Sequence, residues 1–274
     1  MAGFSAEWLT QREPADHAAR SVALTRALVD ALPRDTALRI LDLAAGTGSN
    51  LRYLTTAVSV RTRPTSDGPR PAHWLLVDHD PALLTLVPTM SGVETRCLDL
   101  ASLDNREIFD GRTLVTASAL LDLVSEAWLR ALAARCADVG AAVLFALSYD
   151  GRIECSPEDP DDARIVSLVN EHQRTDKGFG PALGPDATEW AARCFASLGY
   201  AVRRARSDWT LAPDARELQQ QLIDGWAQAA TATAPTHAAI IDGWRHRRLA
   251  HVAANRSHLI VGHEDLAAWL LART

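Results

Sequence analysis

The sequence has very little lysine. Lys177 is the one lysine among 28 basic residues in a chain of 274, so the others are arginines. With 34 acidic residues the formal net charge is −6, and this balance argues against general binding of nucleic acids, which requires a basic surface. We attribute the abundance of arginine and alanine to GC-rich coding and draw no functional conclusion from it.

The sequence is also poor in cysteine. Its four cysteines, at positions 97, 136, 155 and 194, are widely spaced and include no C-x-x-C pair. This spacing argues against a zinc site or a disulfide framework and is typical of reduced thiols in the cytoplasm. Since no cluster of carboxylates and histidines has metal-ligand spacing either, we expect chemistry that does not depend on a metal ion.

Long apolar runs are missing as well. The stretch 141–147 is among the longest, far below the roughly 18 residues that a membrane span needs. The first residues carry charges where a signal peptide has its apolar core. We therefore expect a soluble cytoplasmic protein with no membrane partner.

Segments of strand character alternate with segments of helical character along the chain, a pattern typical of an α/β fold with a mostly parallel sheet between helices. The expected strands are 38–43, 73–77, 93–97, 113–117, 141–148, 200–209 and 258–261. The expected helices are 14–32, 49–58, a short one from 81, 125–136, 163–173, 186–198, 214–230 and 236–254. Segments 61–72, 151–162 and 174–185 are expected to be irregular, and no linker divides the chain into separate cores.

The most informative motif runs from Asp42 to Gly48, with the sequence DLAAGTG, where a strand is expected to end and a helix to begin. Glycines there allow close approach to a ligand, and the helix N-terminus offers free N–H groups. A dinucleotide site would need a third glycine, but Leu51 stands in its place, and a P-loop would need a lysine. A tight turn without any ligand is the alternative.

This motif resembles the first motif of the class I S-adenosylmethionine-dependent methyltransferases, D/E-x-G-x-G-x-G, with Ala44 at the first glycine. The resemblance extends in order over residues 38–148. It implies a Rossmann-like three-layer sandwich with a mostly parallel seven-stranded sheet whose last strand is antiparallel. It also divides a single domain, 1–274, into a helical N-terminal extension or lid (1–36), a cofactor-binding half (37–150) and a substrate-side half with helical insertions (151–274).

The resemblance assigns S-adenosylmethionine as cofactor and implies its ligands. Asp78 would hold the ribose hydroxyls with His79 beside it, while Asp80 suits an N-cap before Pro81. The third strand would supply residues for the adenine, and the fourth would contact the methionine end. Either Arg12 or Arg20 could pair with the cofactor carboxylate. The full predicted cofactor set is Asp42, Ala44, Gly46, Gly48, Asp78, His79, Asp99, Leu100, Ser118 and Arg20.

The methyl acceptor is bounded mainly by absences. The DNA amino-methyltransferase tetrad (N/D/S)-P-P-(Y/F/W) does not occur after the fourth strand. With the negative net charge, this favours an oxygen or nitrogen of a small molecule over nucleic acid. Rim residues that could act in catalysis are Asp122, Tyr149 and His17, and those that could contact substrate are Arg12, Asp122, Tyr149 and Asp150.

Two alternatives to a methyltransferase stay open. One is a protein of the same fold that binds S-adenosylmethionine without catalysis or with another reaction, such as aminopropyl transfer. The other, which Leu51 and Asp99 argue against, is a nucleotide-dependent oxidoreductase. The sequence leaves the oligomeric state undetermined.

Overall fold

A central sheet organises the molecule. The computed structural model describes residues 4–33, 37–59 and 72–271. Within them the strand order is β3-β2-β1-β4-β5-β8-β6, with β7 paired to β8 beside this path. The strands are β1 (Leu38–Leu43), β2 (Ala72–Asp78), β3 (Val93–Cys97), β4 (Leu114–Ser118), β5 (Ala142–Ser156), β6 (Tyr200–Arg206), β7 (Trp209–Leu211) and β8 (His258–Leu270). Strands β1 to β5 pair in parallel, whereas β8 is antiparallel to both β5 and β6.

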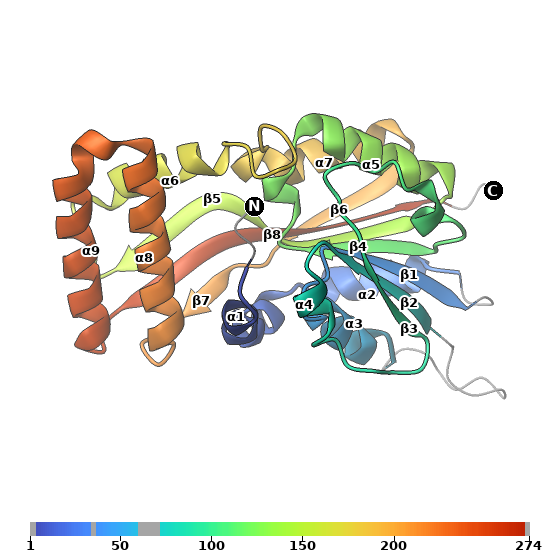
Figure 1. Cartoon of the computed structure of the whole chain (residues 1–274), viewed down its shortest axis with the longest axis horizontal. Helices are drawn as coiled ribbons and strands as arrows, with labels where there is room; N and C mark the ends of the chain where they lie inside the picture. Colours follow the sequence, from blue (N-terminus) through green and yellow to red (C-terminus); the bar gives the residue numbers. More distant parts are fainter. Residues whose placement is uncertain (1–3, 34–36, 60–71, 272–274) are drawn as a thin grey trace.

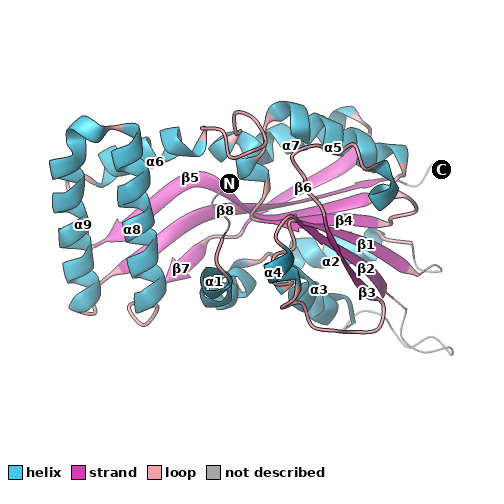
Figure 2. Ribbon diagram, viewed as in Figure 1, coloured by secondary structure: helices cyan, strands magenta, loops and turns pink. Residues whose placement is uncertain are grey.

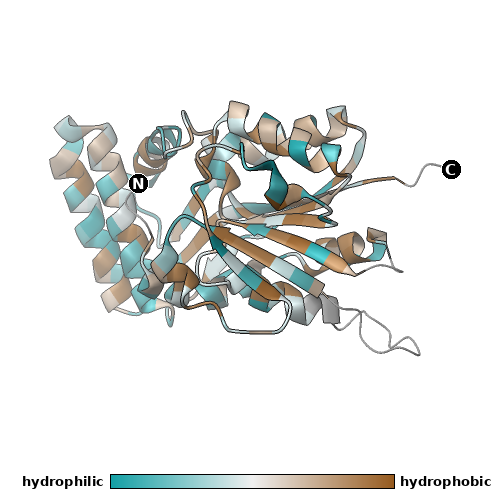
Figure 3. Ribbon diagram, turned by 45° about the vertical axis from the view of Figure 1, so that its right-hand side comes forward, coloured by the Kyte–Doolittle hydropathy of each residue, from teal (hydrophilic) through white to brown (hydrophobic). Residues whose placement is uncertain are grey.

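Helices cover both faces of this sheet, which gives three layers (Figures 1 and 2). The helices are α1 (Ala6–Ala19), α2 (Val22–Ala31), α3 (Ser49–Ser59), α4 (Pro81–Leu84), α5 (Glu126–Asp138), α6 (Asp162–Gln173), α7 (Ala187–Ser197), α8 (Arg216–Thr233) and α9 (Ala238–Ala253). Successive residues of a strand point to opposite faces. Accordingly, Leu41 and Leu43 of β1 pack in the core beneath α5 and α7, while Leu38 and Ile40 pack against α2 and α3. Figure 3 shows the strands as the hydrophobic centre.

The predicted α/β class is confirmed, with the expected strands β1 to β4 within about a residue of their bounds. The N-terminal prediction of one helix over 14–32 is wrong. Two helices form instead, because Ser5 caps the first at the Trp8 N–H and Ser21 caps the second at the Leu24 N–H. Pro14 lies inside α1 and does not begin it. The predicted loop 61–72 falls, apart from Ala72, outside the described residues.

The largest departure from the sequence prediction concerns β5 and β8. These strands were expected over 141–148 and 258–261, but they run to 15 and 13 residues and project beyond the rest of the sheet (Figure 1). Register shifts between Phe145 and Ser148 and between Tyr149 and Ile153 allow the pair to continue. Residues 151–156, the first half of the segment expected to be irregular, are therefore strand. The predicted strand 200–209 divides into β6 and β7.

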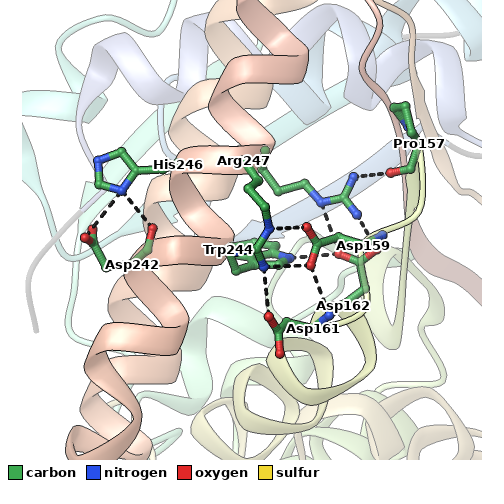
Figure 4. A network of polar contacts seen from close by, with 9 residues as sticks. Pro157, Asp159, Asp161, Asp162, Asp242, Trp244, His246 and Arg247 are labelled. Atoms are coloured by element: carbon green, nitrogen blue, oxygen red, sulfur yellow. Dashed lines mark hydrogen bonds and ion pairs between the residues drawn. The ribbon is translucent and has the colours of Figure 1, made fainter.

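The projecting strands and the helices α6, α8 and α9 enclose a core of their own. We call this region of the molecule the extension. Arginines of α9 hold the extension together through hydrogen bonds and ion pairs with aspartates (Figure 4). Arg247 donates to Asp159 at 2.6 and 2.9 Å and to Asp161 at 2.8 Å. The fully buried Arg248 donates to both carboxylate oxygens of Asp162 and to the Pro157 carbonyl. Among the helices of the described ranges, none combines the length and apolar character needed to cross a membrane.

Candidate cofactor and acceptor site

A glycine turn between β1 and α3 forms one wall of a cavity at the carboxyl edge of the parallel strands, where open α/β sheets bind ligands. Ala44, Gly46 and Gly48 all have positive φ, at 52°, 53° and 80°. The Ala45 N–H donates to the Val77 carbonyl at 3.0 Å, which ties the turn to β2. A Cβ at position 46 would lie 3.1 Å from Cδ1 of Leu9, so α1 covers the turn directly.

Asp78, the last residue of β2, also lines the cavity and is 5% exposed. Its Oδ2 accepts the Gly46 N–H at 2.8 Å, and its Oδ1 accepts the Asp80 N–H at 3.0 Å. These bonds fix the carboxylate while each oxygen keeps capacity for a further donor. His79 also lines the cavity, with its Nδ1 3.3 Å from the same carboxylate.

A buried polar network lies beneath the turn. Asn50 donates from Nδ2 to Oδ1 of Asp42 at 2.7 Å and to Oγ1 of Thr116 at 3.0 Å. Its Oδ1 accepts from Nη1 of Arg20 at 3.0 Å. Asp42 Oδ2 has no hydrogen-bond partner, although Asp42 lines the cavity. Burial raises the pKa of Asp42 to about 7, against the opposing effects of Asn50 and Arg20.

Helix α1 forms the opposite wall. Arg12 donates to Asp16 through Nε at 2.9 Å and Nη2 at 3.1 Å, and its guanidinium lies 5.0 Å from the Trp209 ring centre. Asp16 also accepts from Nε1 of Trp209 at 3.1 Å, so this pair joins the cavity to β7. Both charged residues are buried and line the cavity.

Two further contacts hold α1 against the turn. Glu13 accepts from Nε of Arg52 at 2.7 Å and from Nη2 at 2.5 Å, while Nη1 of Arg52 donates to the Thr47 carbonyl at 2.7 Å. The Arg52 guanidinium holds the pKa of Glu13 below its usual value. Nε2 of His17 lies 3.1 Å from Oγ of Ser49 at the start of α3. Helix α1, which belongs to the N-terminal segment predicted as a lid, is therefore held against the glycine turn and α3.

The cavity encloses about 1000 Å³, part of it open to solvent. Six of the predicted cofactor residues, Asp42, Ala44, Gly46, Asp78, His79 and Ser118, line it, as does Arg12. The other residues of the cavity wall are not among the predicted site residues. They are Phe4, Leu9, Asp16, Ala45, Thr47, Ser49, Asn50, Leu83, Ala119, Leu120, Leu123 and Phe179. Ser49 and Asn50 were the easiest of these to find from the sequence, because they directly follow the glycine turn.

Other predicted cofactor residues lie outside this wall. Asp99 is exposed and accepts the Ala101 N–H at 2.8 Å. Leu100 is buried in the core, and its carbonyl accepts from Nε1 of Trp128 at 2.6 Å. Arg20 is buried behind Asn50, and Gly48 faces Leu76 and Val87. Their direct contact with a cofactor stays a prediction.

The predicted acceptor residues Asp122, Tyr149 and Asp150 lie shortly after β4 and in the middle of β5. Asp122 belongs to the short 3₁₀ helix η2 (Leu121–Leu123) and is buried, which raises its pKa to about 6. The Tyr149 hydroxyl donates to Oδ1 of Asn170 at 2.8 Å, and burial raises its pKa. Asp150 is bound by Arg152 at 2.6 and 2.9 Å. None of the three is part of the cavity wall formed by described residues.

Comparisons with known proteins bear on the fold. No protein-family model matches the sequence, and no curated protein matches it. The cyclopropane synthase MmaA2 of Mycobacterium tuberculosis superposes with a TM-score of 0.50 at 10% identity, over 97% of this chain and 94% of that one. A SAM-dependent methyltransferase of Geobacter sulfurreducens, solved with S-adenosyl-L-homocysteine, gives a TM-score of 0.48 at 14% identity, over 99% and 100%.

The similarity to MmaA2 extends over nearly the whole of both chains. Because the sequence identity is only 10%, this similarity shows the fold alone. The chain has the Rossmann-like fold of the class I S-adenosylmethionine-dependent methyltransferases.

Proposed function

We propose that this protein is an S-adenosylmethionine-dependent methyltransferase that acts on an oxygen or nitrogen of a small molecule. The observation that carries the proposal is the placement of the glycine turn, Asp78 and Asp42 around one cavity at the carboxyl edge of the sheet. The fold is compatible with more than one reaction, since MmaA2 is described as a cyclopropane synthase.

The residues present fit the cofactor. Asp78 is held by two backbone N–H groups and can accept from the vicinal ribose hydroxyls, a charge-assisted contact. The unpartnered Oδ2 of Asp42 offers a site for the cofactor ammonium, which would satisfy a buried carboxylate oxygen. Once bound, S-adenosylmethionine supplies a methyl group already activated on a sulfonium.

The chain itself would bind and orient the cofactor and the acceptor, and it would exclude water from them. Helix α1 covers the turn through Leu9 and is fastened there by Glu13 and Arg52. His17 contacts Ser49 and so suits a positioning role better than a reaction with the acceptor. The Tyr149 hydroxyl already donates to Asn170, and its raised pKa keeps it protonated at neutral pH, so it is not available as a base. Asp122 is the remaining predicted base.

The class of acceptor and the cellular location are part of the same proposal. The net charge of −6 supports a small acceptor over nucleic acid, and the four cysteines, all unpaired, support a cytoplasmic location.

Calorimetry with S-adenosylmethionine and S-adenosylhomocysteine tests the cofactor, and heat with both is expected. Asp78→Ala should weaken binding by at least tenfold, because a hydrogen bond to a charged group is worth about 1.5–3 kcal/mol. The neighbouring Asp80→Ala is the matched control, since Asp80 caps α4 through the Ala82 N–H. Absence of binding to the wild type, or equal affinities for both variants, would contradict the assignment.

A further inference from the structure

Asp122 is a buried carboxylate with unused hydrogen-bonding capacity beside the cavity. The residue is 7% exposed, and its Oδ1 has no hydrogen-bond partner. Leu120 and Leu123, on either side of it in the chain, both line the cavity. A buried carboxylate oxygen without a donor is costly, so this position favours a ligand that brings one.

The nearby cations are already engaged. On α1, Arg12 is held in a two-point pair by Asp16. Lys177, in the loop after α6, lies 3.0 Å from the His172 carbonyl and 2.9 Å from Oγ1 of Thr175. Both act on Asp122 through charge alone. On β5, the Tyr149 backbone N–H is a hydrogen-bond donor to the Asp122 carboxyl group, and the phenol of Tyr149 is neutral.

His263 of β8 adds no positive charge to this region. Burial, with the repulsion of Arg12, lowers its pKa to about 3. Its ring packs against those of Tyr149 and Trp209, with centres 6.3 and 5.1 Å away. Among the described carboxylates of this region, Asp122 is therefore the one without a positively charged side chain hydrogen-bonded to it.

Part of the cavity wall next to Leu120 and Leu123 is apolar. Phe179 contributes to it from the loop 174–185 and is braced edge-on against Trp128, with ring centres 5.5 Å apart. Leu9, Leu120 and Leu123 belong to the same wall, which also includes the Arg12–Asp16 pair. A ligand suited to this region has an apolar body and one positively charged hydrogen-bond donor. An alcohol would leave the carboxylate charge uncompensated, and an acid would be repelled by it.

We propose that the methyl acceptor is a small primary or secondary amine with an apolar body, whose ammonium group binds Asp122. This rests on the proposed function. The ammonium proton passes to the Asp122 carboxylate, which frees the nitrogen lone pair. The nitrogen then bonds to the methyl carbon as the carbon–sulfur bond breaks, and the electron pair of that bond stays on sulfur. The carboxyl group returns its proton to solvent when the methylated ammonium leaves.

Calorimetry with three probes of the same shape tests this: 2-phenylethylamine, 2-phenylethanol and 3-phenylpropanoate. Each is titrated at pH 8 into the protein alone and into protein saturated with S-adenosylhomocysteine. We expect the amine to bind at least tenfold more tightly than the other two. Asp122→Asn should remove this preference and leave the affinity for the alcohol unchanged. Lowering the pH to 5 should weaken only the amine, because Asp122 then gains a proton.

Two variants serve as controls. Asp214→Asn changes an exposed carboxylate before α8 and should bind like the wild type. Asp122→Glu retains the charge and should retain a preference for the amine, which guards against a folding defect in Asp122→Asn. Equal binding of amine and alcohol, no amine binding, or an unchanged amine affinity in Asp122→Asn overturns the inference. Failure of S-adenosylhomocysteine to bind contradicts instead the proposed function.

Discussion

Ala44 illustrates how a single residue stores strain at a functional turn. It stands where the methyltransferase motif has glycine, and its φ of 52° lies in the left-handed region that disfavours a Cβ. We expect Ala44→Gly to raise the free energy of unfolding by up to about 1 kcal/mol, because the relieved strain exceeds the entropy that glycine loses on folding. Urea denaturation measures this. Ala45→Gly, next in the turn but without a positive φ, should be neutral or destabilising, and equal gains in both would contradict the strain account.

The protonation of Asp42, at the start of the same turn, makes the stability of the folded protein depend on pH. Its pKa is about 7 in the folded protein and near 4 when unfolded, so the folded state binds more protons between these values. Stability from this group therefore falls as pH rises from about 4 to 7. Asp42→Asn should remove that loss, so its stability relative to the wild type should rise by at most about 1.4 kcal/mol per pH unit in this window. Thermal denaturation of both proteins at pH 5, 6, 7 and 8 tests the sign, and a constant difference would refute it.

At the scale of elements, the sequence predicts best where local signals agree. Strand β1, the glycine turn and α3 follow from an apolar run, two glycines and a helical pattern, and they were located correctly. Asp78 could be chosen because it directly ends an apolar strand. The lengths of β5 and β8 could not be predicted, since residues 149–156 are polar and become strand only through pairing with β8. The approach of α1 to the turn likewise depends on contacts such as Glu13 with Arg52, 39 residues apart.

The fastening of α1 gives a prediction at this scale. Arg52→Ala removes the partner of Glu13 and the donor to the Thr47 carbonyl, so α1 should separate more readily from the turn. We expect faster amide hydrogen exchange in α1 and severalfold weaker binding of S-adenosylhomocysteine. Arg130→Ala, which breaks an exposed pair with Glu126 on α5, is the control and should change neither. Unchanged exchange in α1 would show that Leu9 and the Arg12–Asp16 pair hold the helix without Arg52.

Across the whole molecule, one sheet joins two cores with different tasks. The parallel strands carry the glycine turn and Asp78, while the projecting β5 and β8 carry the extension. Helix α1 bridges them, since Arg12 and Asp16 line the cavity and contact Trp209 of β7. The shape of the cavity wall at Arg12 and Asp16 consequently depends on how firmly the extension is held.

The clamp on α9 is where this dependence can be tested. Arg248 is fully buried, and its replacement by methionine leaves Asp162 without its cation and Trp244 as the remaining donor to Oδ1. Breaking a buried pair on one side costs about 3–5 kcal/mol, so Arg248→Met should strongly lower the unfolding free energy. Arg245→Met, which breaks an exposed pair with Asp224 on the same helix, should leave stability nearly unchanged. Hydrogen exchange resolves where the loss falls: rapid exchange in α6, α8 and α9 with protection kept in β1 to β4 is expected if the extension unfolds by itself. Uniform loss of protection would instead show that the two cores unfold as one unit.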